Sequence, residues 1–188
     1  MHALVYTGTQ KIDYRKEKDP TPKPGENIIR VQASGICGSD MHAFHGQDER
    51  RVPPLILGHE ISGKALDGKL KDNNVVVNAL ISCDTCDYCQ SNRGHLCPVR
   101  TMIGMSKPIK REGGLAELVS VPEKNIFQIS EKLNIKEAAL AEPTAVALHA
   151  VLLAEQNLKK PLSESKILIQ GAGAIGLLCG LILNKEKN

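Results

Sequence analysis

Hydrophobic and polar residues alternate in short stretches through the first two-thirds of the chain. Residues 27–33 place a hydrophobic side chain at every second position from Ile29 onward, which is the period of a half-buried strand. Residues 75–77 and 115–121 predict two further strands. Glycines interrupt these stretches at intervals typical of all-β barrels or sandwiches, at Gly58, Gly63, Gly68, Gly104, Gly113 and Gly114. This part of the chain is therefore predicted to be mainly β.

A helical pattern follows the predicted strands. Asn134, with Glu137 three residues later, predicts the capped start of a short helix. Pro143 suits a first helical position and begins a strongly apolar helix through Ala154. We therefore expect a mainly β domain with some helix over residues 1–155.

A glycine-rich motif connects a predicted strand at residues 166–170 to a last predicted helix. Its glycines are Gly171, Gly173 and Gly176. In a dinucleotide-binding fold they allow a tight turn, a close approach of the pyrophosphate and close packing of helix on strand. The helix N-terminus would then face the phosphates. The alternative is a tight strand-to-helix turn that binds nothing.

The same motif predicts that residues 156–188 are the start of a Rossmann domain. Only twelve residues follow Gly176 (188 − 176), so the second strand and the acidic residue that holds the ribose are not included. We therefore expect the chain to be a fragment of a longer enzyme and to be inactive alone. The choice between NAD and NADP stays open.

Composition and charge limit the classes of function. The chain has 188 residues, 41% of them hydrophobic and 24% charged, as in an ordinary folded protein. A net charge of +3 without an arginine-rich patch argues against a nucleic-acid partner. No segment has the pattern of a signal peptide or the length of an apolar membrane span, so neither export nor a membrane partner is expected. We expect a cytoplasmic protein.

Four cysteines lie in one short segment, at Cys83, Cys86, Cys89 and Cys97. Such close spacings bring four sulfurs around one tetrahedral Zn²⁺, with Zn–S distances of about 2.3 Å. Two disulfides in a secreted domain are the alternative, but nothing in the sequence indicates export. The segment is predicted to be a structural zinc lobe.

A second set of metal-binding residue types is spread along the predicted barrel. Cys37 and His59 are the natural pair of ligands, and a carboxylate from Glu60 or Glu142 would complete them. A catalytic zinc takes three protein ligands and keeps one position open. His59 and Glu60 are neighbours, so they can share an ion only if the chain turns there, as Gly58 allows. Taken singly, each residue also has an ordinary explanation: a small buried Cys, a satisfied His or a solvated Glu.

The order of the motifs resembles the zinc-containing medium-chain dehydrogenase/reductase family over nearly the whole chain. The matching motifs are Gly35-Ile36-Cys37-Gly38-Ser39-Asp40, Gly58-His59-Glu60-x-x-Gly63, the four cysteines, Gly113-Gly114-Leu115-Ala116-Glu117, Ala141-Glu142-Pro143 and the glycine motif. The resemblance implies a GroES-like β-barrel catalytic domain followed by a Rossmann domain. Glu142 is similar to the residue of the polyol and threonine dehydrogenase branch, where classical alcohol dehydrogenases have a Cys.

The resemblance also implies roles for individual residues. Cys37 and His59 would bind a catalytic zinc with a glutamate, for which Glu60 ranks slightly above Glu142. The four cysteines would bind a structural zinc, which makes two ions per chain. Ser39 and His42 are three residues apart on the short helix expected after Cys37, so they are candidates for a proton relay. Relatives assemble through the Rossmann sheet, so the full-length protein is expected to be a homo-oligomer.

The predicted function is that of a zinc-dependent oxidoreductase. It would oxidise a secondary alcohol or polyol to a carbonyl and transfer hydride to NAD or NADP. Polyols, amino-alcohols such as threonine and simple secondary alcohols all remain open as substrates. A non-catalytic zinc-stapled binding or scaffold domain is the main alternative. A zinc-free reductase of the quinone-reductase type would lack both sets of metal ligands.

Overall fold

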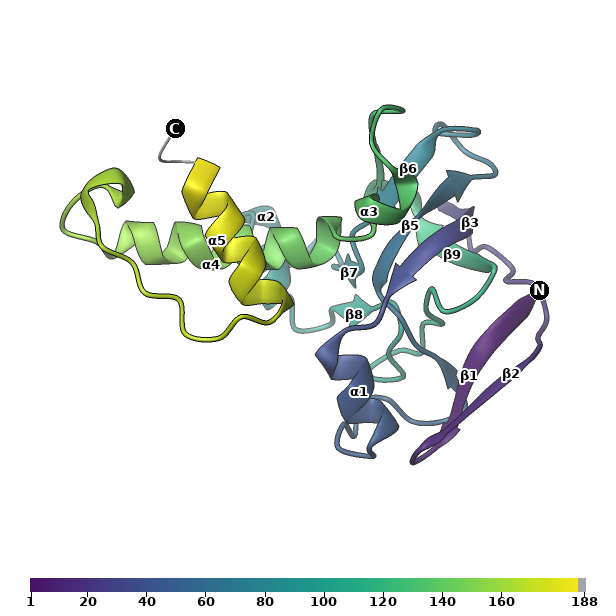
Figure 1. The fold of residues 1–188 in the computed structure, drawn as a ribbon. Coiled ribbons are helices and arrows are strands. Elements are labelled where there is room, and N and C mark those ends of the chain that lie inside the picture. The colour runs from purple at the N-terminus through teal and green to yellow at the C-terminus, as the bar shows by residue number, and fades with distance from the viewer. Residues whose placement is uncertain (186–188) are drawn as a thin grey trace. The chain divides into compact units, whose positions relative to one another are not determined.

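The computed structural model describes residues 1–185 and divides the chain into two units, Met1–Ala139 and Leu140–Asn188 (Figure 1). The predicted domain boundary between residues 155 and 156 lies inside the second unit. The reason is that α4 (Ala141–Gln156) makes its main contacts with α5 (Ala174–Lys185). The two units are described separately.

Two antiparallel sheets form most of the first unit. Their strands are β1 (His2–Gly8), β2 (Lys11–Lys16), β3 (Glu26–Gly35), β4 (Leu55–Ile56), β5 (Glu60–Ala65), β6 (Asn74–Val77), β9 (Leu118–Pro122) and β10 (Ile126–Gln128). The larger sheet has five strands in the order β10-β6-β5-β3-β9, and the smaller has three in the order β2-β1-β4. A bridge between Ala3 and Ala116 joins β1 to the segment before β9.

The alternating pattern explains which side of the central strand faces the core. In β3, Ile29 is buried and Arg30 is exposed, as the sequence predicts. Ile29 packs in one aliphatic cluster with residues of other strands of the sheet, including Val75 of β6 and Val119 of β9. Burying each such side chain contributes about 1.5–3 kcal/mol. The predicted strand at 115–121 is confirmed only from Leu118, because the preceding residues leave the large sheet toward β1.

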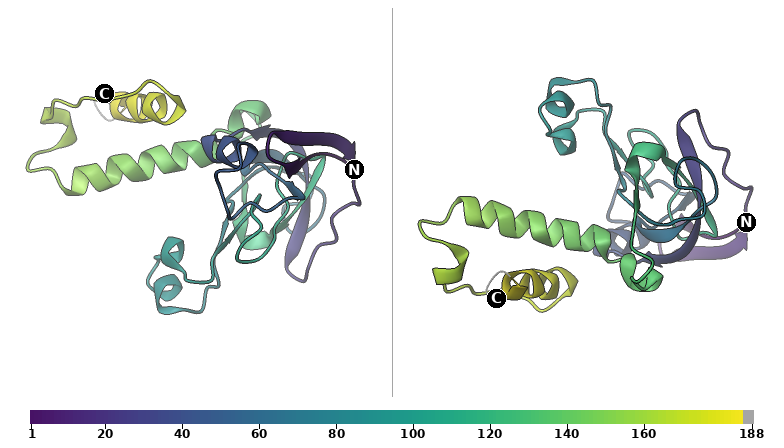
Figure 2. Two further views of the ribbon diagram at one scale, coloured as in Figure 1. Left: turned by 90° about the horizontal axis from the view of Figure 1, so that it is seen from below. Right: turned by 90° about the horizontal axis from the view of Figure 1, so that it is seen from above.

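A lobe extends from the first unit between two short strands, β7 (Leu80–Ile81) and β8 (Thr101–Met102). It carries the one-turn helix α2 (Asp87–Gln90) and the 3-10 turn η1 (Gly94–Leu96). Both views in Figure 2 show this lobe standing away from the sheets of its unit. The lobe therefore has little apolar surface to pack against.

Short helices complete the first unit. Helix α1 (Gly38–Phe44) follows β3, and the 3-10 turn η2 (Glu123–Asn125) connects β9 to β10. Helix α3 (Ile135–Ala138) begins at the predicted cap, because the Asn134 side chain accepts a hydrogen bond from the Lys136 amide at 2.9 Å. The mainly β prediction for this part of the chain is confirmed.

The second unit contains α4, the 3-10 turn η3 (Leu162–Glu164) and α5. Helices α4 and α5 lie side by side (Figure 2). The predicted helix from Pro143 is confirmed, although it begins two residues earlier. The predicted strand at 166–170 is wrong for the described residues: no strand pairs with it there, and Leu168 is 90% exposed. No helix within residues 1–185 combines the length and apolar character that a membrane span needs.

Candidate metal centres

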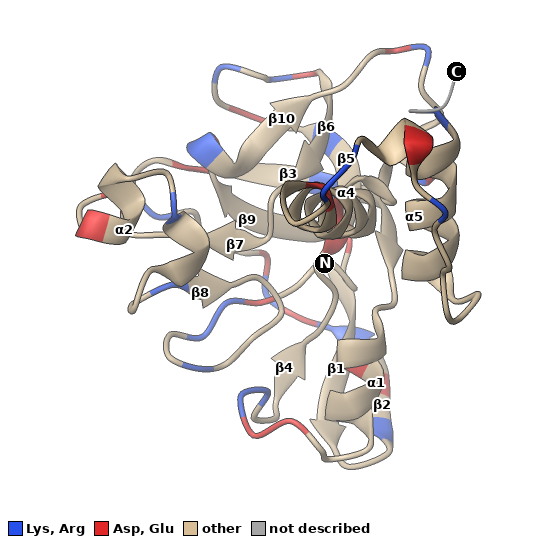
Figure 3. Ribbon diagram, turned by 90° about the vertical axis from the view of Figure 1, so that its left-hand side faces the viewer, with Lys and Arg blue, Asp and Glu red and all other residues tan. Residues whose placement is uncertain are grey.

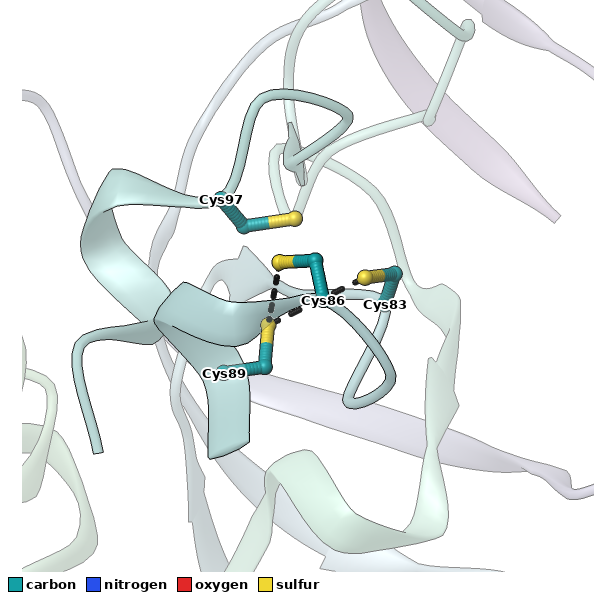
Figure 4. Close-up of side chains that lie close together, drawn as sticks. All are labelled: Cys83, Cys86, Cys89 and Cys97. Carbon is teal, nitrogen blue, oxygen red and sulfur yellow. Dashed lines mark hydrogen bonds between the residues drawn. The ribbon is translucent and has the colours of Figure 1, made fainter. Parts of the chain in front are cut away.

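The four cysteines of the lobe point their sulfurs toward one another (Figure 4). The Sγ atoms of Cys89 and Cys86 lie 3.5 Å apart, and those of Cys89 and Cys83 lie 3.8 Å apart. All four sulfurs, including that of Cys97, lie within 4.8 Å of one another. A tetrahedron with Zn–S distances near 2.3 Å has edges of about 3.8 Å. A disulfide needs about 2.05 Å, so the geometry fits a metal and not two bridges.

The electrostatics of the lobe also favour a cation. The hydroxyl and amide of Thr85 lower the pKa of Cys83 to about 5. The amide of Cys89 favours a thiolate at Cys86, but desolvation and the neighbouring sulfurs outweigh it and raise the pKa of Cys86 to about 11. One thiolate thus opposes the ionisation of the next. A divalent cation removes this conflict, because it stabilises all four as thiolates.

A second cluster brings together Cys37, His59 and Glu60, with one ligand atom of each within 4.8 Å of the others. Cys37 follows β3 and precedes α1, while Glu60 begins β5, which pairs with β3. The turn predicted before His59 is present, because Gly58 has a φ of +93°, which glycine adopts without strain. Sulfur, imidazole and carboxylate are donors that zinc accepts at a catalytic site.

Asp40 contacts the residues of this second cluster without being one of the three grouped ligands. Its Oδ2 accepts a hydrogen bond from the Cys37 amide at 3.1 Å, and its Oδ1 accepts one from the Gly58 amide at 3.4 Å. The same Oδ1 lies 3.5 Å from Nδ1 of His59. A carboxylate facing one imidazole nitrogen is the usual support for a histidine that binds metal through the other. The arrangement leaves Nε2 of His59 for the metal.

The buried charges around His59 shift each other's pKa. Burial disfavours a charged imidazole, but the Asp40 carboxylate and the Cys37 sulfur outweigh burial and raise the pKa of His59 from 6.5 to about 9. Burial also raises the pKa of Asp40, but His59 and the Cys37 amide lower it by more, so the net shift is downward. A metal ligand must be neutral imidazole, so metal uptake near neutral pH releases a proton.

The Glu60 side chain passes directly over Gly35, its register partner on β3. A Cβ at Gly35 would lie 1.9 Å from Glu60 Oε2 and 3.0 Å from Glu60 Cβ. Burial raises the pKa of the Glu60 carboxyl, as expected for an acid with little water around it. The glycine therefore provides the space that lets this carboxylate reach Cys37 and His59.

Comparison with known proteins identifies the fold. Residues 23–131 match the alcohol dehydrogenase GroES-like domain. The chain belongs to the zinc-containing alcohol dehydrogenase family. This confirms the predicted family and the fold class of a GroES-like domain.

Individual relatives of the chain are dehydrogenases named for different substrates. It is 33% identical to L-galactonate-5-dehydrogenase of Escherichia coli over 183 residues, which is 94% of the chain and 51% of that protein. It resembles the crystal structure of galactitol-1-phosphate dehydrogenase from Escherichia coli with a TM-score of 0.87 and 29% identity, over 98% of the chain and 53% of that structure. It also resembles the crystal structure of a putative zinc-binding dehydrogenase from Sinorhizobium meliloti 1021 bound to NADP. The TM-score is 0.80 and the identity 32%, over 98% of the chain and 53% of that structure. The chain spans about half the length of these relatives.

The structure places the other predicted site residues as follows. Ser39 and His42 both lie on α1, but no hydrogen bond within residues 1–185 joins their side chains, and Ser39 Oγ accepts one from Arg51. Their proton relay stays a prediction. Glu142 is half-buried in the first turn of α4, in the other unit, and its role as a ligand also stays a prediction.

The glycines of the predicted dinucleotide motif precede and begin α5. Gly171 has a φ of +107°, which suits the tight turn predicted there. A Cβ at Gly176 would lie 2.1 Å from the Gly171 carbonyl oxygen, so close packing requires glycine at that position. A Cβ at Gly173 would meet nothing within 4 Å. Their binding of NAD or NADP stays a prediction.

Two residues that support the site were missed by sequence reasoning. Asp40 could have been found, because it stands three residues after Cys37 at the position where an acidic residue caps a helix. Arg51 gave no such signal: it lies in a charged segment typical of an exposed loop. Its side chain is nevertheless fully buried.

Replacing Gly35 with alanine is expected to weaken metal binding at the second cluster by about tenfold or more, as loss of a supporting contact commonly does. The new methyl group occupies the path of the Glu60 carboxylate. Gly38→Ala is the matched control, because a Cβ at Gly38 meets nothing within 4 Å. Zinc affinity measured against a chromophoric chelator checks this. Equal affinities for the two variants would show that Glu60 does not contribute as a ligand.

Proposed function

We propose that the full-length protein is a zinc-dependent dehydrogenase that oxidises a secondary alcohol or polyol to a carbonyl and reduces NAD or NADP. The observation that carries the proposal is the cluster of Cys37, His59 and Glu60, which is separate from the sulfur-only lobe. A scaffold domain needs only the lobe. A mixed set of three donors is what a catalytic zinc requires, because it leaves a position for substrate.

The residues of this cluster and its surroundings have separate proposed roles in holding the metal, orienting a ligand and moving a proton. Cys37 as thiolate, His59 as neutral imidazole and Glu60 as carboxylate would hold the ion, and Asp40 holds the imidazole ring in place. When bound, the zinc supplies a Lewis acid that lowers the pKa of a hydroxyl group. A bound NAD or NADP would supply the acceptor for the hydride of the alcohol, and the hydroxyl proton would leave to solvent. Ser39 and His42 are the proposed route for that proton, and Glu142 is the proposed alternative carboxylate.

The finer parts of the proposal rest on the motifs and on the relatives. We propose two zinc ions per chain, one for each cluster. The turn at Gly171 and the close packing at Gly176 support a dinucleotide at the start of α5. Relatives named for galactonate and galactitol phosphate support a polyhydroxylated substrate. We also propose homo-oligomeric assembly and a cytoplasmic location, as predicted from the sequence.

An activity assay on the full-length protein tests the proposal. Reduction of NAD and NADP is followed at 340 nm with a panel of polyols, sugar acids and amino-alcohols. Cys37→Ser is expected to lower turnover by about a thousandfold or more, since a Lewis acid contributes several kcal/mol to the transition state. Cys179→Ser, which lies outside both clusters, is the control. Undiminished activity of Cys37→Ser, or no turnover with any alcohol, would contradict the proposal.

A further inference from the structure

Arg51 has the largest fully buried side chain of the described residues, and the function proposed above does not use it. It belongs to the acidic and basic run at residues 48–51 between α1 and β4 (Figure 3). The neighbouring Arg50 is 62% exposed at its side chain, whereas that of Arg51 is 0% exposed. A charged side chain is rarely buried completely unless it is paired. The contacts of Arg51 therefore show what keeps it inside.

Each nitrogen of the Arg51 guanidinium donates to a different acceptor. Nη1 donates to Asp48 Oδ2, Nη2 donates to Ser39 Oγ at 3.0 Å, and Nε donates to the Gly104 carbonyl oxygen at 3.2 Å. Nε also lies 3.9 Å from Asp40 Oδ1. Arg50 shares the Asp48 carboxylate but none of the other three contacts.

These contacts reach both stretches of chain that supply the metal ligands. Ser39 and Asp40 follow Cys37 on α1. Gly104 lies against Gly58, the turn before His59: a Cβ at Gly104 would be 3.1 Å from the Gly58 carbonyl oxygen. One planar guanidinium thus holds α1 and the Gly58 turn in a fixed relation. Arg51 touches no ligand atom itself, so it acts through its neighbours.

The charge of Arg51 matters as well as its hydrogen bonds. Asp40 is 2% exposed, and its two ion-pair partners in the described part of the chain are His59 and Arg51. A histidine that binds metal is a neutral ligand, so Arg51 is then the side-chain cation that balances the buried carboxylate. Without Arg51, the buried Asp40 carboxylate would have no side-chain cation to offset its desolvation cost, and it would hold the His59 imidazole less firmly.

We infer that Arg51 is a positioning residue for the second metal cluster, acting through Asp40, Ser39 and Gly104. The inference rests on the proposed function only in that it takes Cys37, His59 and Glu60 to be the metal ligands. The inference adds Arg51 to the residues that support the cluster. The adjacent Arg50 has the same charge and an exposed side chain, so its variant is the matched control.

The test is cobalt binding by the full chain, with zinc retained in the four-cysteine lobe. The signal of the second cluster is the part of the visible spectrum that Cys37→Ser lacks. Arg51→Met is expected to weaken cobalt binding by about tenfold or more and to shift the d–d bands, in line with other residues that support a ligand. Arg51→Lys is expected to recover part of the affinity, and Arg50→Met to stay within about twofold of wild type on the same scale.

Each outcome of the cobalt experiment decides one question. Wild-type affinity and spectrum in Arg51→Met would overturn the inference, and so would equal losses in Arg50→Met and Arg51→Met. Circular dichroism and zinc retained in the lobe show whether Arg51→Met folds. If it does not fold, Arg51→Lys decides instead, and a wild-type cobalt spectrum and affinity in Arg51→Lys would overturn the inference. Absence of a Cys37-dependent signal in the wild-type chain would instead contradict the proposed function.

Discussion

Cys97→Ala is expected to unfold the lobe between residues 82 and 100 while the five-stranded sheet stays folded. Cys97 is the only buried residue in that segment, so the lobe has almost no apolar core of its own. Structural zinc supplies about 10–16 kcal/mol to the folding of small zinc domains, which is more than the lobe can obtain by packing. Hydrogen-exchange mass spectrometry with peptide resolution measures the effect as a loss of protection in lobe peptides alone.

The contacts at the base of the lobe set where the unfolding should stop. Asn125 Nδ2 donates to the carbonyl oxygens of Asn78 at 2.8 Å and Leu80 at 2.7 Å, and Lys124 Nζ donates to that of Ser82 at 2.8 Å. These bonds do not depend on the metal. Cys179→Ala is the control, since Cys179 lies outside the lobe. Full protection of the lobe in Cys97→Ala would show that metal does not hold it together.

Asp40→Ala is expected to reduce the free energy of unfolding of the first unit by about 3 kcal/mol, as removing one partner of a buried charge pair does. The change leaves the amides of Cys37 and Gly58 without their acceptor. It also removes the carboxylate that faces His59, which should weaken zinc binding at the second cluster by about 10–100-fold. Urea denaturation and a competition titration for zinc measure the two effects.

Asp13→Ala is the control for the effect of losing a carboxylate. Asp13 lies on β2, where its Oδ2 is 3.7 Å from Nη1 of Arg15, and both side chains are largely exposed. A surface ion pair of this kind contributes about 0–1 kcal/mol. If Asp40→Ala loses no more stability or zinc affinity than Asp13→Ala, Asp40 does not support the site.

How far the sequence predicts this site depends on how local each interaction is. The four sulfurs are brought together by short spacings, so the lobe is readable from residues 83–97 alone. The pairing of Cys37 with His59 and Glu60 needs the β3–β5 register, but Gly58 indicates the turn that makes it possible. These local signals were enough to predict which side chains gather in the two clusters, and their binding of metal stays a prediction.

Interactions between distant parts of the chain are what the sequence does not reveal. Arg51 looks like a loop residue until Gly104, 53 residues later, provides a carbonyl oxygen for its guanidinium. The segment 166–170 has the apolar pattern of a strand, yet a strand is defined by its partner, and no described residue pairs with it. A hydrophobic pattern predicts which segments are apolar enough to be buried, but not which other segment packs against them.

Zinc counted by elemental analysis on the purified chain tests most directly whether two separate metal centres exist. The two clusters predict two zinc ions in the wild-type chain and one each in Cys37→Ser and Cys86→Ser, with the remaining ion at the unaltered cluster. Only the ion retained by Cys86→Ser should be lost when His59 is also replaced. A wild-type chain with a single ion that Cys37→Ser keeps in full would contradict the account.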